Sequence, residues 1–119
     1  MKYLTYLTFI LMITSCAYNS EEELYPGEVS CDTTDVSFTS DVFPIMENNC
    51  TNCHNSSNPP LGISLDSYSD ITDIAGSGRL LGAIKHEAGY TPMPQGAPLL
   101  QECKIAAIEA WIKDGMPDN

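Results

Sequence analysis

The sequence predicts an all-α fold, a small helical bundle, and three observations support this prediction. Apolar residues recur at helical spacing in four segments of the chain. Serine, glycine and proline residues mark where these segments begin and end. No two segments of alternating apolar and polar residues are joined by a tight turn, so no β-hairpin is expected. With 119 residues, the chain is short enough that its core needs additional covalent or cofactor ties.

The first expected helix begins at Ser40, a residue type that favours the N-terminal cap, and leads the chain into Cys50. Along it, Val42, Ile45 and Met46 follow the spacing i, i+3 and i+4 that places apolar side chains on one face.

The next two expected helices are short. One covers residues 67–75 and the other residues 79–87, each with an apolar stripe at helical spacing. On the second of these, His86 lies on the polar side between Lys85 and Glu87.

The last expected helix covers residues 101–114 and has the clearest periodicity. Gly115 ends it and Pro117 follows, which is typical of a helix C-terminus. Trp111 lies on its apolar face and is expected in the core. Residues 89–98 contain glycine, proline, methionine and glutamine without periodicity, so we expect a loop there.

The segment Cys50-Thr51-Asn52-Cys53-His54 is a CxxCH motif. Two thiols at this spacing match the two vinyl groups of haem, and the adjacent imidazole reaches the iron from the same side. The motif therefore predicts one covalently attached haem c, with Cys50 and Cys53 as thioether links and His54 as an iron ligand. A thioredoxin-like redox site and half of a zinc site are the alternatives. They would need a βαβ setting or a second Cys or His pair at ligand spacing, and the sequence has neither.

Residues 1–15 have the features of a signal peptide for export. Lys2 precedes an uncharged, mostly apolar run over residues 3–13, which is too short to remain as a membrane-spanning helix. The following Ile13-Thr14-Ser15-Cys16 resembles a bacterial lipobox, and the resemblance implies cleavage before Cys16 and a diacylglycerol on its sulfur. An ordinary signal peptide followed by a chance cysteine is the alternative. We expect an exported protein, anchored by lipid to a bacterial membrane on the periplasmic side or at the outer-membrane surface.

Residues 16–30 are expected to form an acidic flexible tether. Ser20-Glu21-Glu22-Glu23 is an acidic cluster, and Pro26-Gly27 breaks any helix that starts there. In some bacterial lipoproteins such a run directs the protein to the outer face of the outer membrane, which this run resembles. A solvated linker is the alternative.

The chain is strongly acidic, with 16 acidic and 5 basic residues and a formal net charge of −11. Removal of Lys2 with the leader changes −11 to −12. Such a field excludes nucleic acid as a partner, and it repels anionic membrane surfaces. It favours redox partner proteins with basic docking patches, although a generic contribution to solubility explains the charge equally well.

The chain has five cysteines, and three of them are assigned above. Cys31 and Cys103 remain, and an exported chain meets an oxidising compartment, so we expect a disulfide between them. In the chain-entropy model the loop that it closes contributes about 4 kcal/mol. Two buried, unpaired cysteines are the alternative.

The order of these parts resembles the class I type cytochrome c domain. That domain has a helix leading into CxxCH, a proximal loop with proline, short middle helices, a methionine-bearing loop and a last helix that crosses the first. The resemblance covers residues 31–117 of an expected domain at residues 31–119, and it is strongest with the short cytochrome c lipoproteins. Besides CxxCH, its motifs are Met93-Pro94-Gln95-Gly96, which matches MPxG, and Ile108-Glu109-Ala110-Trp111-Ile112-Lys113-Asp114-Gly115, which matches I..WI..G. The Gly-Pro of the family's proximal loop is here Asn58-Pro59-Pro60, which leaves open which carbonyl orients His54.

The resemblance implies Met93 as the second axial ligand of the iron. A thioether opposite an imidazole stabilises ferrous iron and raises the reduction potential, as an electron carrier requires. His86 is the rival ligand, but on the polar side of its helix it is expected to be solvated or to face a propionate. Met46 and Met116 are expected to be packing or exposed residues.

The two haem propionates are anions that need partners, and Arg79 and Lys85 lie between CxxCH and the methionine loop. We expect Arg79 to take this role, with a plain surface cation as the alternative. The sequence thus predicts a monomeric, monohaem c-type cytochrome that carries single electrons outside the cytoplasm and is not an enzyme. The alternative is a haem-based peroxidase or a gas or redox sensor, with an open or His86-ligated distal site.

Overall fold

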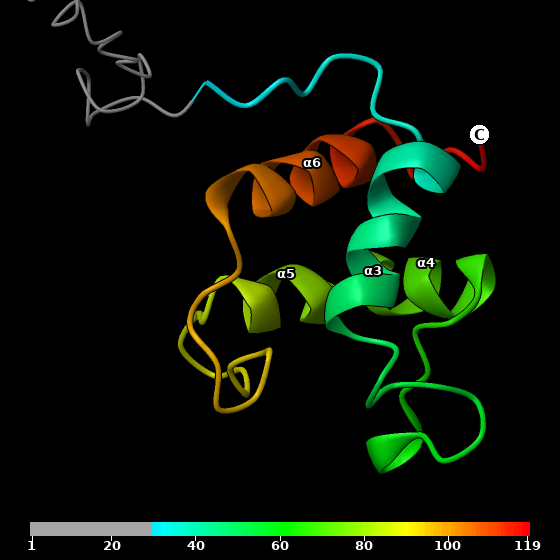
Figure 1. Ribbon diagram of the computed structural model, residues 1–119, viewed down its shortest axis with the longest axis vertical. Helices are drawn as coiled ribbons and strands as arrows, with labels where there is room; N and C mark the ends of the chain where they lie inside the picture. The colour runs from blue at the N-terminus through cyan, green and yellow to red at the C-terminus, as the bar shows by residue number, and fades with distance from the viewer. Residues whose placement is uncertain (1–29) are drawn as a thin grey trace, which may run out of the picture.

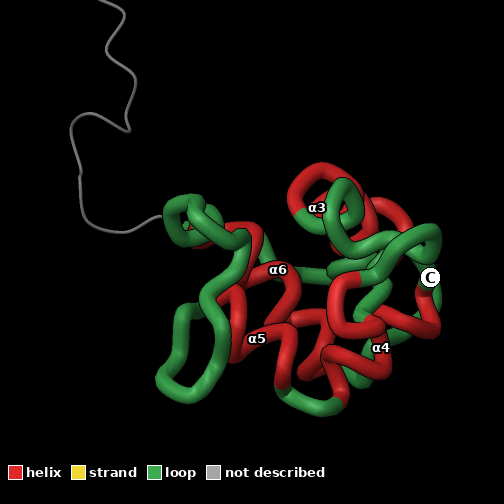
Figure 2. Tube along the Cα trace, turned by 90° about the horizontal axis from the view of Figure 1, so that it is seen from below, coloured by secondary structure: helices red, strands yellow, loops and turns green. Residues whose placement is uncertain are grey.

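The computed structural model describes residues 30–119 of the chain. In this range the fold is all-α, as predicted: it contains four α-helices and two short helical turns, and Figure 2 shows helices and loops without a strand. No helix among these residues is long and apolar enough to cross a bilayer. The expected signal peptide, the lipidation site Cys16 and the tether up to residue 29 lie outside the described residues.

The first helical segment begins three residues earlier than predicted. Ser37 is the N-terminal cap, and its Oγ accepts a hydrogen bond of 3.0 Å from the Ser40 amide. A π-helical turn, η2 (Phe38–Val42), follows and runs directly into α3 (Phe43–Asn49), whose C-terminal cap is Cys50. The earlier start adds one more aromatic ring to the buried face of this segment.

Three further helices follow, namely α4 (Tyr68–Gly76), α5 (Arg79–Ile84) and α6 (Glu102–Lys113). The bounds of α4 and α6 lie within one residue of the predicted ones. The third expected helix is a correction, since α5 ends at Ile84 rather than at residue 87. A single helical turn, η3 (Pro60–Gly62), lies in the loop between α3 and α4.

The helices share one apolar core, in which α6 packs against η2 and α5, and α4 packs against α5 (Figure 1). Trp111 is fully buried at its centre, 5.6 Å from the ring of Phe38 between centroids. The indole N–H of Trp111 donates to the Pro117 carbonyl at 3.0 Å, so the polar end of this side chain is satisfied. Met46 is also fully buried. Both residues are packing residues, as the sequence predicts.

The two ends of the described chain are fastened to the same part of the bundle. The expected disulfide between Cys31 and Cys103 is present, with an S–S distance of 2.04 Å, and it ties the segment before η2 to α6. The C-terminal residue Asn119 accepts hydrogen bonds from the amides of Phe38 and Thr39, each of 2.9 Å. These ties fix the start of the helical segment that leads into CxxCH.

Candidate functional site

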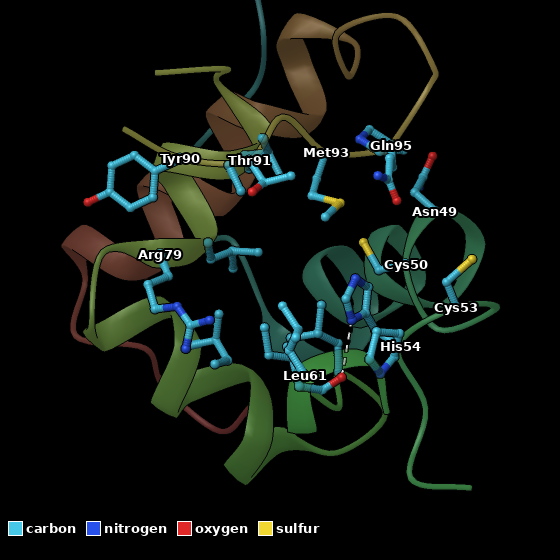
Figure 3. Close-up of a pocket in the computed structure, with 18 of the residues that line it drawn as sticks. Asn49, Cys50, Cys53, His54, Leu61, Arg79, Tyr90, Thr91, Met93 and Gln95 are labelled. Carbon is cyan, nitrogen blue, oxygen red and sulfur yellow. Dashed lines mark hydrogen bonds between the residues drawn. The ribbon is translucent and has the colours of Figure 1, made fainter. Parts of the chain in front are cut away.

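A cavity of about 600 Å³ opens on one side of the bundle (Figure 3). Its walls come from residues 49–54, from the loop that contains η3, from α5 and from residues 89–95. A volume of this size falls within the range of roughly 300–1,000 Å³ that is usual for small-molecule and cofactor sites. The CxxCH motif and Met93 therefore line one cavity, although His54 and Met93 are 39 positions apart in the sequence.

One wall carries the CxxCH side chains. The Cys50 amide ends α3 by donating to the Met46 carbonyl at 2.8 Å. The amides of Cys53 and His54 then both donate to the Cys50 carbonyl, at 3.1 and 2.9 Å. This tight turn brings Cys50, Cys53 and His54 to the same edge of the cavity, as Figure 3 shows.

The His54 ring is oriented by a backbone carbonyl, and that carbonyl belongs to Ile63. Nδ1 of His54 lies 3.1 Å from the Ile63 oxygen. Because a carbonyl only accepts, Nδ1 carries the proton, and Nε2 of the neutral ring keeps its lone pair for a metal. Histidine ligands of metals commonly donate their other N–H in this way. The sequence left open which carbonyl orients His54. In the structure it is the carbonyl of Ile63, which follows η3 and lies outside Asn58-Pro59-Pro60.

The Cys50 thiol differs from the attacking thiol of a redox dithiol. Cys50 and Cys53 are the cysteines of residues 30–119 that are not disulfide-bonded. Burial raises the pKa of the Cys50 thiol to about 11, so it is protonated at neutral pH. A reactive CxxC site instead lowers the pKa of its attacking thiol.

The zinc alternative also lacks support in the described part of the chain. Among residues 30–119 no group of three or more His, Cys, Asp or Glu side chains could hold a metal ion. A structural zinc site takes four such ligands.

The opposite wall carries Met93, which is half-buried in the loop between α5 and α6. Its amide donates to the Ala83 carbonyl of α5 at 3.0 Å, and its own carbonyl lies 3.1 Å from Nε2 of His86. Figure 3 shows the Met93 thioether reaching into the cavity from the side opposite His54. An imidazole and a thioether thus face one space.

The structure places His86 differently from the sequence prediction. Because α5 ends at Ile84, His86 lies beyond the helix, with a backbone φ of 55° in the left-handed region. Its imidazole contacts the Met93 carbonyl, and His86 is not among the residues that line the cavity. The expected position on the polar side of a helix is therefore wrong.

The two cations considered for the propionates have separate roles. Lys85 pairs with Glu109 at 2.6 Å, and this hydrogen bond and charge raise the pKa of Lys85. Arg79 begins α5 and lines the cavity at the edge away from Cys50 and Cys53 (Figure 3). Of these two residues, only Arg79 is at the cavity.

Tyr90 is a cavity residue that the sequence analysis missed. Its ring packs so closely on Gly82 that a Cβ atom at that position would collide with it. It lies beside Arg79 on the same side of the cavity. The signal in the sequence was Gly82 itself, because a glycine within a short helix often marks a close approach.

Comparisons of the chain with protein-family models, with curated proteins and with solved structures found no match. The resemblance to the class I type cytochrome c domain therefore rests on the sequence motifs and their order along the chain.

Proposed function

We propose that the protein is a monohaem c-type cytochrome that carries single electrons outside the cytoplasm. The observation that carries this proposal is the composition of the cavity: CxxCH lies on one side and a methionine on the other. The two motifs are far apart in the sequence, and both line one space of cofactor size.

The residues around the cavity fit a haem group. Cys50 and Cys53 supply two sulfur atoms at one edge for thioether bonds, and His54 presents Nε2 beside them. Met93 supplies a thioether from the opposite side. A bound haem would supply a reversible one-electron couple at its iron.

The remaining side chains would protect and orient the group. Leu65, Leu80 and Ile84 line the cavity and are buried, so they would exclude water from the haem faces. Arg79 would pair with a propionate at the edge remote from the cysteines. If His54 and Met93 both bound the iron, no position would remain for a substrate, so we propose a carrier rather than an enzyme.

The site of action and the partners are proposed from the sequence. A lipid on Cys16 would hold the protein at a bacterial membrane, and the acidic chain, with its net charge of −11, would attract redox proteins through basic docking patches. We propose a monomer.

A spectroscopic redox titration of the purified, exported protein tests this function. We expect covalent haem, a reversible one-electron transition, and in the oxidised state an absorption band near the red end of the visible spectrum that signals methionine ligation. Cyanide and carbon monoxide should bind slowly. Rapid binding of either ligand, without that band, would favour a peroxidase or a sensor over an electron carrier. A protein without covalent haem would contradict both functions.

A further inference from the structure

The C-terminal end of α5 is closed by a Schellman motif, and His86 occupies its left-handed position. The Glu87 amide donates to the Gly82 carbonyl at 2.9 Å, and the His86 amide donates to the Ala83 carbonyl at 3.3 Å. These are the two hydrogen bonds that define the motif. His86 is the left-handed residue of this motif, with a φ of 55°.

The same motif ends α6, but with glycine at the equivalent position. The Met116 amide donates to the Trp111 carbonyl at 2.9 Å, the Gly115 amide donates to the Ile112 carbonyl at 3.1 Å, and Gly115 has a φ of 90°. Glycine is usual here because a Cβ atom is unfavourable in the left-handed region. A histidine is therefore less favourable than glycine at this position of the backbone. The contacts of its side chain offer an explanation for its presence.

The His86 side chain holds the Met93 segment against the end of α5. Its Nε2 lies 3.1 Å from the Met93 carbonyl, and since a carbonyl only accepts, Nε2 is the donor. The Met93 amide donates to the carbonyl of Ala83, the residue that also accepts from the His86 amide. Both backbone groups of Met93 are thus attached to one helix end.

We propose that His86 is a positioning residue for Met93. By holding the Met93 carbonyl, it keeps the thioether directed into the cavity. This inference rests on the proposed function, in which Met93 is a ligand of the iron. His86 then acts on the ligation without touching the iron or the haem.

Three substitutions of His86 in the full exported protein separate this role from the alternatives. His86→Gly removes the donor and relieves the left-handed backbone. His86→Asn also tolerates that backbone, but its amide lies too near the main chain to reach Met93. His86→Gln carries an N–H donor on a longer side chain and serves as the rescue variant.

We expect His86→Gly and His86→Asn to weaken the red absorption band of the oxidised protein. Cyanide should bind roughly fivefold faster, the factor that corresponds to the loss of one neutral hydrogen bond. His86→Gln should restore both properties at least in part, and covalent haem staining should stay unchanged in all three variants. The thermal unfolding temperature of His86→Gly should change little, because glycine suits the Schellman position and this gain offsets the lost hydrogen bond.

Two outcomes would overturn the inference. If His86→Gly and His86→Asn keep the band and the cyanide rate of the unmodified protein, His86 has no positioning role. If His86→Gln loses the band as fully as His86→Gly, the imidazole itself is required and a hydrogen bond does not explain its role.

A failure of the proposed function would look different from a failure of this inference. If the unmodified protein carried no covalent haem, the proposed function would fall, and hydrogen exchange at the Met93 amide would still judge the attachment of the loop. Faster exchange in His86→Gly and His86→Asn than in His86→Gln would support that attachment, and equal exchange would overturn it. If haem were attached but the unmodified protein lacked the red band, Met93 would not be a ligand, and the role of His86 toward the iron would fall with it.

Discussion

The two walls of the cavity are built in different ways. Cys50, Cys53 and His54 follow a helix and share one turn, in which the later two amides bond to the first carbonyl at 3.1 and 2.9 Å. Met93 lies in a long loop, and its backbone is held by bonds to Ala83 and His86 at the end of α5.

This difference in construction predicts a rigid CxxCH wall and a more adjustable methionine wall. The backbone of the CxxCH wall is held by bonds within one turn that directly follows α3. The methionine wall belongs to a loop without a helix of its own and is held by a few bonds to the end of α5, so we expect it to open at a lower free energy than the CxxCH wall. Changes in the first wall should therefore affect whether haem is attached, and changes in the second should affect how the iron is ligated.

The largest effect is expected from breaking the CxxCH wall. A double variant, Cys50→Ala with Cys53→Ala, should lose all covalent haem because no sulfur atom remains for a thioether bond. Haem staining of a denaturing gel measures this directly. The matched control is Cys31→Ser with Cys103→Ser, which removes the other cysteine pair and should keep the stain. Staining that persists without Cys50 and Cys53 would remove the basis of the proposed function.

Breaking the methionine wall should leave haem attached and change its chemistry. Met93→Leu keeps the apolar volume but has no sulfur, so the red band should disappear and cyanide should bind faster. The reduction potential should fall by on the order of 0.1 V, within the range of about 0.8 V that axial ligands span. Met116→Leu is the control and should change neither property. If Met93→Leu left both the red band and the cyanide rate unchanged, another residue would be the second ligand.

The disulfide supports both walls from outside the cavity, so its loss should affect stability more than the spectrum. Cys31→Ser with Cys103→Ser should lower the free energy of unfolding by about 2–4 kcal/mol, because the unfolded chain gains freedom. Urea unfolding measures the change, and the haem spectrum should stay as it is. Mass spectrometry of the unreduced protein should first detect a peptide that joins Cys31 to Cys103, and two alkylated thiols there would contradict the structure.

The smallest effect concerns the loop beside His54. Hydrogen bonds from the Ser64 hydroxyl, at 2.6 Å, and the Ser56 amide, at 2.8 Å, lower the pKa of Asp66. This carboxylate therefore stabilises the fold above its unfolded pKa of 3.8, and the contribution is lost as the pH falls through the lower folded value.

Asp66→Asn should thus be slightly less stable than the unmodified protein at neutral pH, and the difference should shrink in acid below pH 3.8. Urea unfolding midpoints at several pH values measure this trend. Asp118→Asn, which removes an exposed carboxylate near the C-terminus, is the control. A difference that grew in acid would show that Asp66 does not act through its charge.

The ends of two helices show how far the sequence could be interpreted. The end of α6 is predicted within one residue because Gly115 is the residue type expected in a Schellman motif. The end of α5 is predicted three residues too late, because His86 occupies the same position without that signal. Residue preferences did not predict the left-handed backbone at His86, because histidine is not the residue type expected at that position.

Residue type and spacing were sufficient to predict the four helices and the CxxCH turn. The Cys31–Cys103 pair was predicted from the number of cysteines, because it remained after the other three had been assigned. The partners that orient the cavity residues required the tertiary structure. The carbonyls of Ile63 and Ala83 are chemically the same as every other carbonyl of the chain, so only the path of the backbone decides which one meets His54 or Met93.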